Sequence, residues 1–279
     1  MLCQPQSPMP NINKLQDLIM RMRLLVGGAF LAACSTESLI TTANKEDGLN
    51  YEQIQTHQIT LSALIRNTNT QNFRVYLDGD GIPWRQGEPS RNPTGKTKLG
   101  LQLFLRDPNA NLYLSRPCYD ITPMPPSCTT QHWTSGRYSA WVVNALTEAI
   151  RQQAGAKPIE LVGYSGGGTL AVLIAQDYAQ VNRVLTVASN LDHQRWTELH
   201  QSPPLVNSLN PSKQGSSRAE ELHLFGARDI EVPPSMNQDY FRIHTEARFG
   251  VTADFDHHCC WINYWPAILA EWDQTNRGQ

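Results

Sequence analysis

Apolar and polar positions along this chain form short blocks that predict strands separated by helices. Strand-like patterns, with apolar or partly alternating positions bounded by turn residues, occur at 57–65, 73–77, 112–114, 159–162, 184–188, 221–225 and 248–253. Helical spacing of apolar residues occurs at 135–154, 169–179, 233–245 and 262–272. The apolar run at 99–105 fits either a helix or a strand.

Strands that alternate with helices in this way are typical of an α/β fold. The pattern predicts a mainly parallel central sheet with helices on both faces. In such sheets functional sites form at the carboxyl ends of the strands. The candidate catalytic residues described below each follow a predicted strand, which places them at that edge.

The N-terminal region has the parts of an export signal. Arg21 and Arg23 precede the apolar run 24–33, and Cys34 follows it. A run of this length is too short to span a membrane, which takes about 20 apolar residues. The letters LAAC resemble a bacterial lipobox, which implies cleavage before Cys34 and diacylation of that cysteine. The alternative is an apolar helix of the folded domain that happens to carry a cysteine.

The chain then divides into three parts. Residues 1–33 are the predicted lipoprotein signal peptide, 34–56 a polar tether and 57–279 one α/β domain. Because Ser35 rather than aspartate follows the cysteine, we expect an exported protein anchored by lipid to the outer membrane.

The composition of the chain indicates the size of its core and which partners it can bind. Apolar residues make up 40%, enough for a sizeable core. The 23 basic and 25 acidic residues give a net charge of −2, so no electrostatic signal for nucleic acid is present.

Four cysteines remain after the expected signal and lipid site. Cys118 and Cys128 flank a proline-rich stretch, and a disulfide between them would close a short loop in an oxidising compartment; two free thiols are the alternative. Cys259 and Cys260 are adjacent, which leaves a vicinal disulfide or two buried thiols open. The cluster 257–260 (HHCC) lacks the ligand spacing of a zinc site, so we expect no metal.

The strongest motif is G-x-S-x-G around Ser165. Gly163 and Gly167 lie two residues on either side of the serine, between a predicted strand and a predicted helix. A serine on such a tight strand-to-helix turn needs small neighbours, and the backbone NH of Gly166 can help to hold an oxyanion. The alternative is a glycine-rich packing turn with an incidental serine.

A serine needs a base and an acid, and α/β-hydrolases carry these in the order serine, acid, histidine. The segment 226–233 (GARDIEVP) follows a predicted strand and offers Asp229 as the acid. Asp192, which also follows a strand, is the competing choice, and Glu231 is the third.

The base must come later in the chain. His257 and His258 follow the last predicted strand, and His257 is preferred over His258 because its context resembles the histidine turn of hydrolases. His244 lies on a predicted helix that faces another layer.

A second oxyanion donor should come from the loop after an early strand. The segment 78–81 (DGDG) follows the strand at 73–77, and its position predicts the backbone NH of Asp80 as the donor. An ordinary turn is the alternative. The negative Asp80 side chain should then turn into a salt bridge, for which Arg85 or Arg91 is available.

These motifs together resemble a family. The matching segments are YLDGDG, SRPCY, HWTSGRYS, GYSGGG, SNLDHQRWTELH, SLNP and HHCCW. They cover most of the predicted domain and are similar to a group of bacterial α/β-hydrolase lipoproteins. The resemblance implies the α/β-hydrolase fold and a hydrolase chemistry, without a substrate. Asp78 stands where many hydrolases have histidine, which leaves the oxyanion donor less certain than the other site residues.

The predicted reaction is acyl transfer from an ester, thioester or amide to water, through an acyl-enzyme on Ser165 and without a cofactor. Two alternatives are an acyltransferase with the same residues and a non-catalytic binding lipoprotein. We expect a small-molecule or lipid-like acyl substrate. Four tryptophans are candidates for an apolar acyl pocket, with a plain core role as the alternative: Trp84, Trp133, Trp196 and Trp261.

Overall fold

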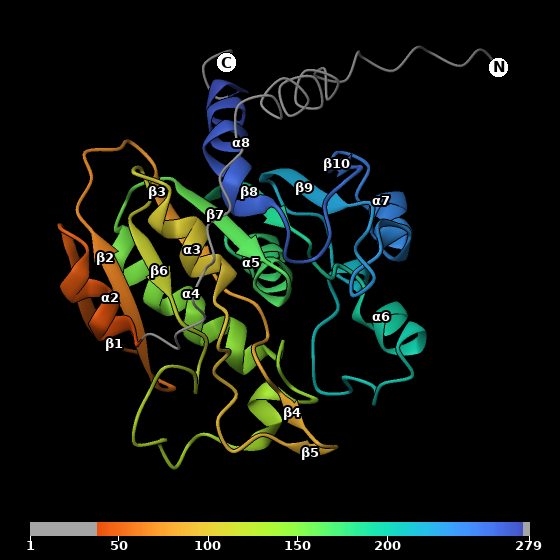
Figure 1. Cartoon of the computed structure of the whole chain (residues 1–279), viewed down its shortest axis with the longest axis horizontal. Coiled ribbons are helices and arrows are strands. Elements are labelled where there is room, and N and C mark those ends of the chain that lie inside the picture. Colours follow the sequence, from red (N-terminus) through yellow and green to blue (C-terminus); the bar gives the residue numbers. More distant parts are fainter. Residues whose placement is uncertain (1–37, 276–279) are drawn as a thin grey trace.

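The fold is built around one central sheet (Figure 1). The computed structural model describes residues 38–275. Its eight-stranded sheet has the order β1-β2-β6-β3-β7-β8-β9-β10, and β4 pairs with β5 in a separate hairpin. In the large sheet only β2 runs against its neighbours, so the remaining strands point the same way. The prediction of a mainly parallel sheet is confirmed.

The bounds of the elements follow in chain order. The strands are β1 (Leu49–Gln55), β2 (Thr60–Arg66), β3 (Phe73–Leu77), β4 (Trp84–Arg85), β5 (Glu88–Pro89), β6 (Leu112–Leu114), β7 (Ile159–Tyr164), β8 (Val181–Val187), β9 (Glu220–Gly226) and β10 (Arg248–Thr252). The helices are α2 (Leu39–Lys45), α3 (Leu99–Leu105), α4 (Ala140–Ala154), α5 (Gly166–Asp177), α6 (His193–Leu199), α7 (Gln238–Ile243) and α8 (Trp261–Thr275). Short 3₁₀ turns are η1 (Thr130–Trp133), η2 (Pro211–Lys213) and η3 (Pro234–Asn237).

Helices cover both faces of the sheet because side chains alternate along the central strands. On one face Val75 and Leu161 pack in a core with α4 and α5. On the other face Tyr76 and Val162 pack with α3 and α8. The central strands β3 and β7 are buried along their whole length, which explains why their patterns are apolar apart from Arg74 and Glu160.

The predicted tether is folded where the structure describes it. Ser38 caps α2 by accepting a hydrogen bond from the Thr41 NH, and β1 pairs along its full length with β2. The tether prediction is therefore wrong for residues 39–55. The sequence of β1, LNYEQIQ, is mostly polar because this edge strand buries only Leu49 and Ile54. Cys34 and the predicted signal peptide 1–33 lie outside the described residues.

Two predicted helices have different bounds. The helix predicted at 135–154 begins at Ala140, because Ser139 caps it by accepting from the Val142 NH. The helix predicted at 233–245 is a 3₁₀ turn followed by the short α7, with prolines at the start of the turn. The ambiguous run 99–105 is helical.

Residues 38–275 contain two disulfides, one between Cys118 and Cys128 and one between the adjacent Cys259 and Cys260. The first closes the proline-rich loop that follows β6. The second lies in the loop between β10 and α8. Among residues 38–275 no helix has both the length and the apolar character needed to cross a membrane.

Candidate active site

Ser165 lies on a strained turn between β7 and α5. Its backbone has φ 50° and ψ −124°, a left-handed conformation that residues with a Cβ rarely adopt. The turn is held because the Ser165 NH donates to the Val187 carbonyl at 2.9 Å. A Cβ on Gly163 would come within 2.5 Å of the Gly168 nitrogen, and one on Gly167 would come within 2.6 Å of the Asp78 carbonyl oxygen. The two glycines of the motif are thus required by close backbone contacts.

The predicted serine, acid and base, which would form a catalytic triad, come together at the carboxyl edge of the sheet. His257 Nδ1 lies 2.8 Å from Asp229 Oδ2, and His257 Nε2 lies 3.1 Å from Ser165 Oγ. The residues His257 and Asp229 are only 5% and 3% exposed. With the Nδ1 proton donated to the carboxylate, Nε2 is left to accept the proton of the serine hydroxyl.

The Asp229 carboxylate is oriented by its own loop. Its second oxygen, Oδ1, accepts the backbone NH of Glu231 at 2.9 Å and of Val232 at 2.7 Å. The loop follows β9, and the histidine loop follows β10, which pairs with β9 in parallel. Neighbouring strands therefore bring acid and base together across a sequence separation of 28 residues.

The competing acid is used elsewhere. Asp192 caps α6 by accepting from the backbone NH groups of Gln194 and Arg195, and it also accepts from the Asn210 amide at 2.8 Å. Its carboxylate is thus committed to a helix start and a neighbouring loop. His244 ends α7, where its ring stacks on Tyr240 with centroids 4.1 Å apart.

His258 and Glu231 lie at the edge of the triad. His258 is exposed and its Nε2 lies 3.1 Å from Glu231 Oε1. The Glu231 side chain is half exposed and reaches within 3.8 Å of His257 Nε2. The structure thus places the less preferred histidine beside the triad, with no contact to Ser165 among the described hydrogen bonds.

Two backbone NH groups are available as oxyanion donors. In the described part of the chain, neither the Gly166 NH nor the Asp80 NH has a hydrogen-bond acceptor. The NH of Gly79 is already used, because it donates to the Asp78 carboxylate at 2.8 Å. A Cβ on Gly166 would come within 2.6 Å of Asp80 Cγ, so the two predicted donor residues lie side by side.

The Asp80 side chain forms salt bridges, but with partners other than those predicted. Arg116 and Arg137 pair with its two oxygens, and Tyr138 donates to it at 2.6 Å. The predictions of Arg85 or Arg91 are wrong, since neither contacts Asp80. Burial would raise the pKa of Asp80, but the two arginines outweigh it and lower that pKa to about 2. The Asp80 carboxylate is therefore charged, and its two salt bridges anchor the loop 78–81.

These two arginines were not recognised as site residues from the sequence. Both occur in segments singled out for the family resemblance, SRPCY and SGRYS, but nothing local indicates a shared partner. Asp78 has a related role, because it accepts from the Gly100 NH at 3.0 Å and the Tyr113 hydroxyl at 3.0 Å. Two aspartates thus hold the loop after β3.

A cavity of about 810 Å³ opens beside the serine. Ser165, Gly166 and His257 form part of its wall, and Trp84 and Trp196 line it as predicted for two of the four tryptophans. Trp133 and Trp261 do not line it, because both are buried in the core. Much of the remaining lining is apolar or aromatic, including Ile82, Leu99, Tyr119 and Val232.

The structure offers no arrangement for a metal ion within residues 38–275. No group of three or more His, Cys, Asp or Glu side chains converges in that part of the chain. The His257–Cys260 segment instead carries the triad base and a disulfide.

Comparison with known proteins places this fold. A family model described as alpha/beta hydrolase fold matches residues 116–240. The chain has the α/β-hydrolase fold. No curated protein sequence matches it.

Among solved structures the chain is similar to several hydrolases at low sequence identity. A bacterial membrane phospholipase A is 14% identical, with a TM-score of 0.60 over 96% of this chain and 99% of that one. An esterase from Pyrococcus furiosus is 12% identical, with a TM-score of 0.58 over 91% and 96%. A putative lipase from Acinetobacter baumannii is 14% identical, with a TM-score of 0.58 over 89% and 97%. At these identities the likeness concerns the fold.

Proposed function

We propose that this α/β-hydrolase-fold protein is a serine hydrolase that cleaves a carboxylic ester, thioester or amide through an acyl-enzyme. The observation that carries the proposal is the hydrogen-bonded chain from Ser165 through His257 to Asp229, hereafter the triad. A strained serine, an oriented base and free NH donors meet at one cavity wall. Such a combination is needed for acyl transfer and has no evident value for packing.

The mechanism follows from the positions of these atoms. As Ser165 Oγ attacks the substrate carbonyl carbon, its proton passes to His257 Nε2, and Asp229 stabilises the resulting imidazolium. The carbonyl oxygen becomes an oxyanion, to which the NH groups of Gly166 and Asp80 donate. Each such donor is worth about 10²–10³-fold in rate in other hydrolases. His257 then gives its proton to the leaving group, and water releases the acyl group by the reverse sequence.

The substrate class is narrowed by the cavity. Its wall combines tryptophan, tyrosine and aliphatic side chains with charged ones such as Lys96, Lys98 and Asp120. The apolar part of this wall suits an apolar acyl chain. The structural neighbours described as a phospholipase A, an esterase and a putative lipase agree with a lipid-like ester. We therefore propose a carboxylic ester with an apolar acyl group as the substrate.

A fluorophosphonate probe tests the triad directly, because it reacts only with an activated serine. We expect the full-length chain to be labelled and the Ser165→Ala variant to remain unlabelled. Thermal unfolding of both proteins serves as the control for folding. A folded wild-type protein that takes no label would refute the hydrolase proposal.

Lipid anchoring remains a second proposal, based on the lipobox-like segment before Cys34. The disulfide between Cys118 and Cys128 supports an oxidising compartment, since such bonds are rare in the cytosol. We expect the wild-type chain in a bacterial host to incorporate labelled fatty acid and to fractionate with outer membranes. The Cys34→Ala variant should lose the fatty-acid label, and a label that persists would contradict the proposal.

A further inference from the structure

A second hydroxyl–imidazole–carboxylate chain lies beside the triad. Tyr164 precedes the triad serine, His258 follows the triad histidine, and Glu231 comes two residues after the triad aspartate. The Tyr164 hydroxyl lies 3.0 Å from His258 Nδ1, and His258 Nε2 lies 3.1 Å from Glu231 Oε1. The same turns that assemble the triad thus assemble this second chain, and all three side chains line the same cavity.

The carboxylate of Glu231 lies between the two histidines. While Oε1 pairs with His258, Oε2 lies 3.8 Å from His257 Nε2, the atom that faces the serine. The backbone of Glu231 is held separately, because its carbonyl accepts from Trp196 Nε1 at 2.9 Å and lies 2.8 Å from His200 Nε2. Contacts to α6 on one side and to His258 on the other therefore fix this carboxylate near the triad base.

We propose that Glu231 is a positioning residue for the serine hydrolase reaction, and that His258 and Tyr164 hold it in place. This inference rests on the proposed function. When His257 takes the serine proton it becomes positively charged, and a carboxylate 3.8 Å from Nε2 stabilises that charge. Because the Glu231 side chain is 53% exposed, water weakens the attraction, and the expected effect on kcat is about two- to fivefold.

The other carboxylates near His257 already have hydrogen-bond partners. Asp229 holds Nδ1, and Asp256 on the histidine loop accepts the backbone NH groups of His258 and Cys259 at 2.8 and 2.6 Å. Burial, followed by the charge of Asp78, raises the pKa of the Tyr164 hydroxyl in the second chain. None of these carboxylates changes in the variants below, so a change in the pH dependence of the reaction reports on Glu231.

The test is the pH profile of kcat/KM for the full-length chain with a soluble short-chain p-nitrophenyl ester. Removing a negative charge beside the base disfavours the imidazolium, so a variant without that charge should have its acid limb at a lower pH than wild type. We expect Glu231→Gln to lower kcat two- to fivefold, leave KM unchanged and move the acid limb down by about 0.3–0.7 pH units.

Two matched variants separate this effect from others. His258→Gln removes the same exposed ion pair and one of the two contacts that hold Glu231 but keeps its carboxylate, so its acid limb should move down by less than that of Glu231→Gln. Glu198→Gln removes an exposed carboxylate of α6, whose side chain contacts only Gln194 among the described hydrogen bonds, and its profile should match wild type. Glu231→Asp, which keeps the charge with a shorter reach, should fall between wild type and Glu231→Gln.

The outcomes are distinguishable from a failure of the proposed function. An unmoved acid limb in a folded, fluorophosphonate-reactive Glu231→Gln protein would overturn the inference and leave the hydrolase proposal intact. Equal downward shifts in Glu231→Gln and His258→Gln would also overturn it, because the effect would then belong to the ion pair. A wild type without fluorophosphonate labelling would refute the hydrolase proposal itself.

Discussion

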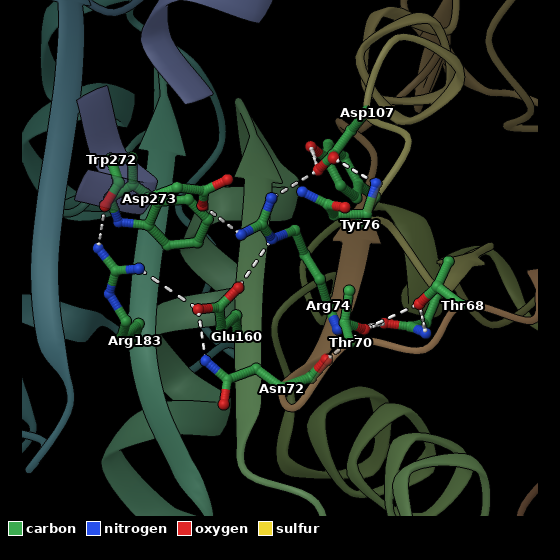
Figure 2. Close-up of polar contacts among 12 residues, drawn as sticks. Thr68, Thr70, Asn72, Arg74, Tyr76, Asp107, Glu160, Arg183, Trp272 and Asp273 are labelled. Atoms are coloured by element: carbon green, nitrogen blue, oxygen red, sulfur yellow. Dashed lines mark hydrogen bonds and ion pairs between the residues drawn. The ribbon is translucent and has the colours of Figure 1, made fainter. Parts of the chain in front are cut away.

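The two ends of the parallel sheet carry charged side chains in opposite ways. At the amino end, Arg74 of β3 lies opposite Glu160 of β7, which lies opposite Arg183 of β8 (Figure 2). Arg74 Nε lies 2.7 Å from Glu160, and its other nitrogens pair with Asp107 at 3.0 Å and Asp273 at 2.5 Å. These groups bind one another and tie the last helix to the sheet.

The central residues of this charged cluster are almost completely buried. Arg74 is 5% and Glu160 2% exposed, and both arginines stack over the Trp272 ring of α8, at 4.7 and 4.3 Å. Burial would lower the pKa of Arg74, but the surrounding carboxylates outweigh it and raise that pKa. The amino end thus uses paired charges for cohesion between the sheet, the turn after α3 and α8.

The carboxyl end instead carries backbone NH groups and a serine that, under the proposed function, act on a substrate. The NH groups of Gly166 and Asp80 lack acceptors among the described residues, and Ser165 is held in a strained conformation. An ion cluster around Asp80 supports the loop that carries one of these NH groups. The difference is between an end whose paired charges stabilise the fold and an end that, under the proposed function, carries the reacting groups.

The largest expected effect tests the carboxyl end. Asp229→Asn should lower kcat by about 10⁴-fold, because the amide no longer holds His257 in the tautomer that accepts the serine proton. The Oδ1 contacts to the loop survive in this variant, so thermal stability should change little. Steady-state hydrolysis of a soluble ester and thermal unfolding provide the two measurements.

The matched control is Asp192→Asn at the start of α6. It should cost less than about 1 kcal/mol of stability, because asparagine caps a helix about as well as aspartate, and kcat should stay within a few-fold of wild type. A collapse of kcat in Asp192→Asn with a mild loss in Asp229→Asn would show that the acid has been misassigned.

The next effect in size tests the amino end. Arg74→Met leaves Glu160, Asp107 and Asp273 without their shared cation, which should lower the free energy of unfolding by about 3–5 kcal/mol in urea titrations. Activity per folded molecule should stay within twofold of wild type, because this end does not contact the cavity.

An exposed arginine provides the comparison for Arg74. Arg242 forms an (i, i+3) pair with Asp239 on the surface of α7, and Arg242→Met should change stability by less than about 1 kcal/mol. Equal losses in the two variants would contradict the assignment of the buried cluster as a stabilising element.

The smallest effect concerns Asp80, whose pKa in the folded protein is about 2, below the ordinary aspartate value of 3.8. A depressed carboxyl pKa gives stability that is present above about pH 4 and is lost as pH falls through 2. The shift corresponds to about 2 kcal/mol, with about half of it lost at pH 3. Urea titrations at pH 6 and pH 3 should therefore show the gap between wild type and Asp80→Asn narrowing by about 1 kcal/mol. A gap independent of pH would contradict the salt-bridge account.

Several parts of this protein could be predicted because their cause is local. Glycines at fixed distances from Ser165, between an apolar strand and an apolar helix, predict the turn, and the alternation of strands and helices predicts the parallel sheet. The polar edge strand β1 was missed because a strand paired on one side, with little buried surface, has no strong pattern. The helix predicted at 135–154 begins only at Ala140, because the Ser139 cap outweighs the apolar periodicity of the residues before it.

Only the tertiary structure decided which distant charges meet. The sequence by itself determined the turn at Ser165 and the order of serine, acid and base, because both depend on neighbouring residues and on the ends of successive strands. Asp80 pairs with Arg116 and Arg137, which are 36 and 57 residues away in the sequence. The pairing arises because β6 lies next to β3 and because the residues just before α4 lie beside the turn that follows Ser165. Long-range electrostatic partners follow from strand order and helix packing, which the local pattern of the chain does not encode.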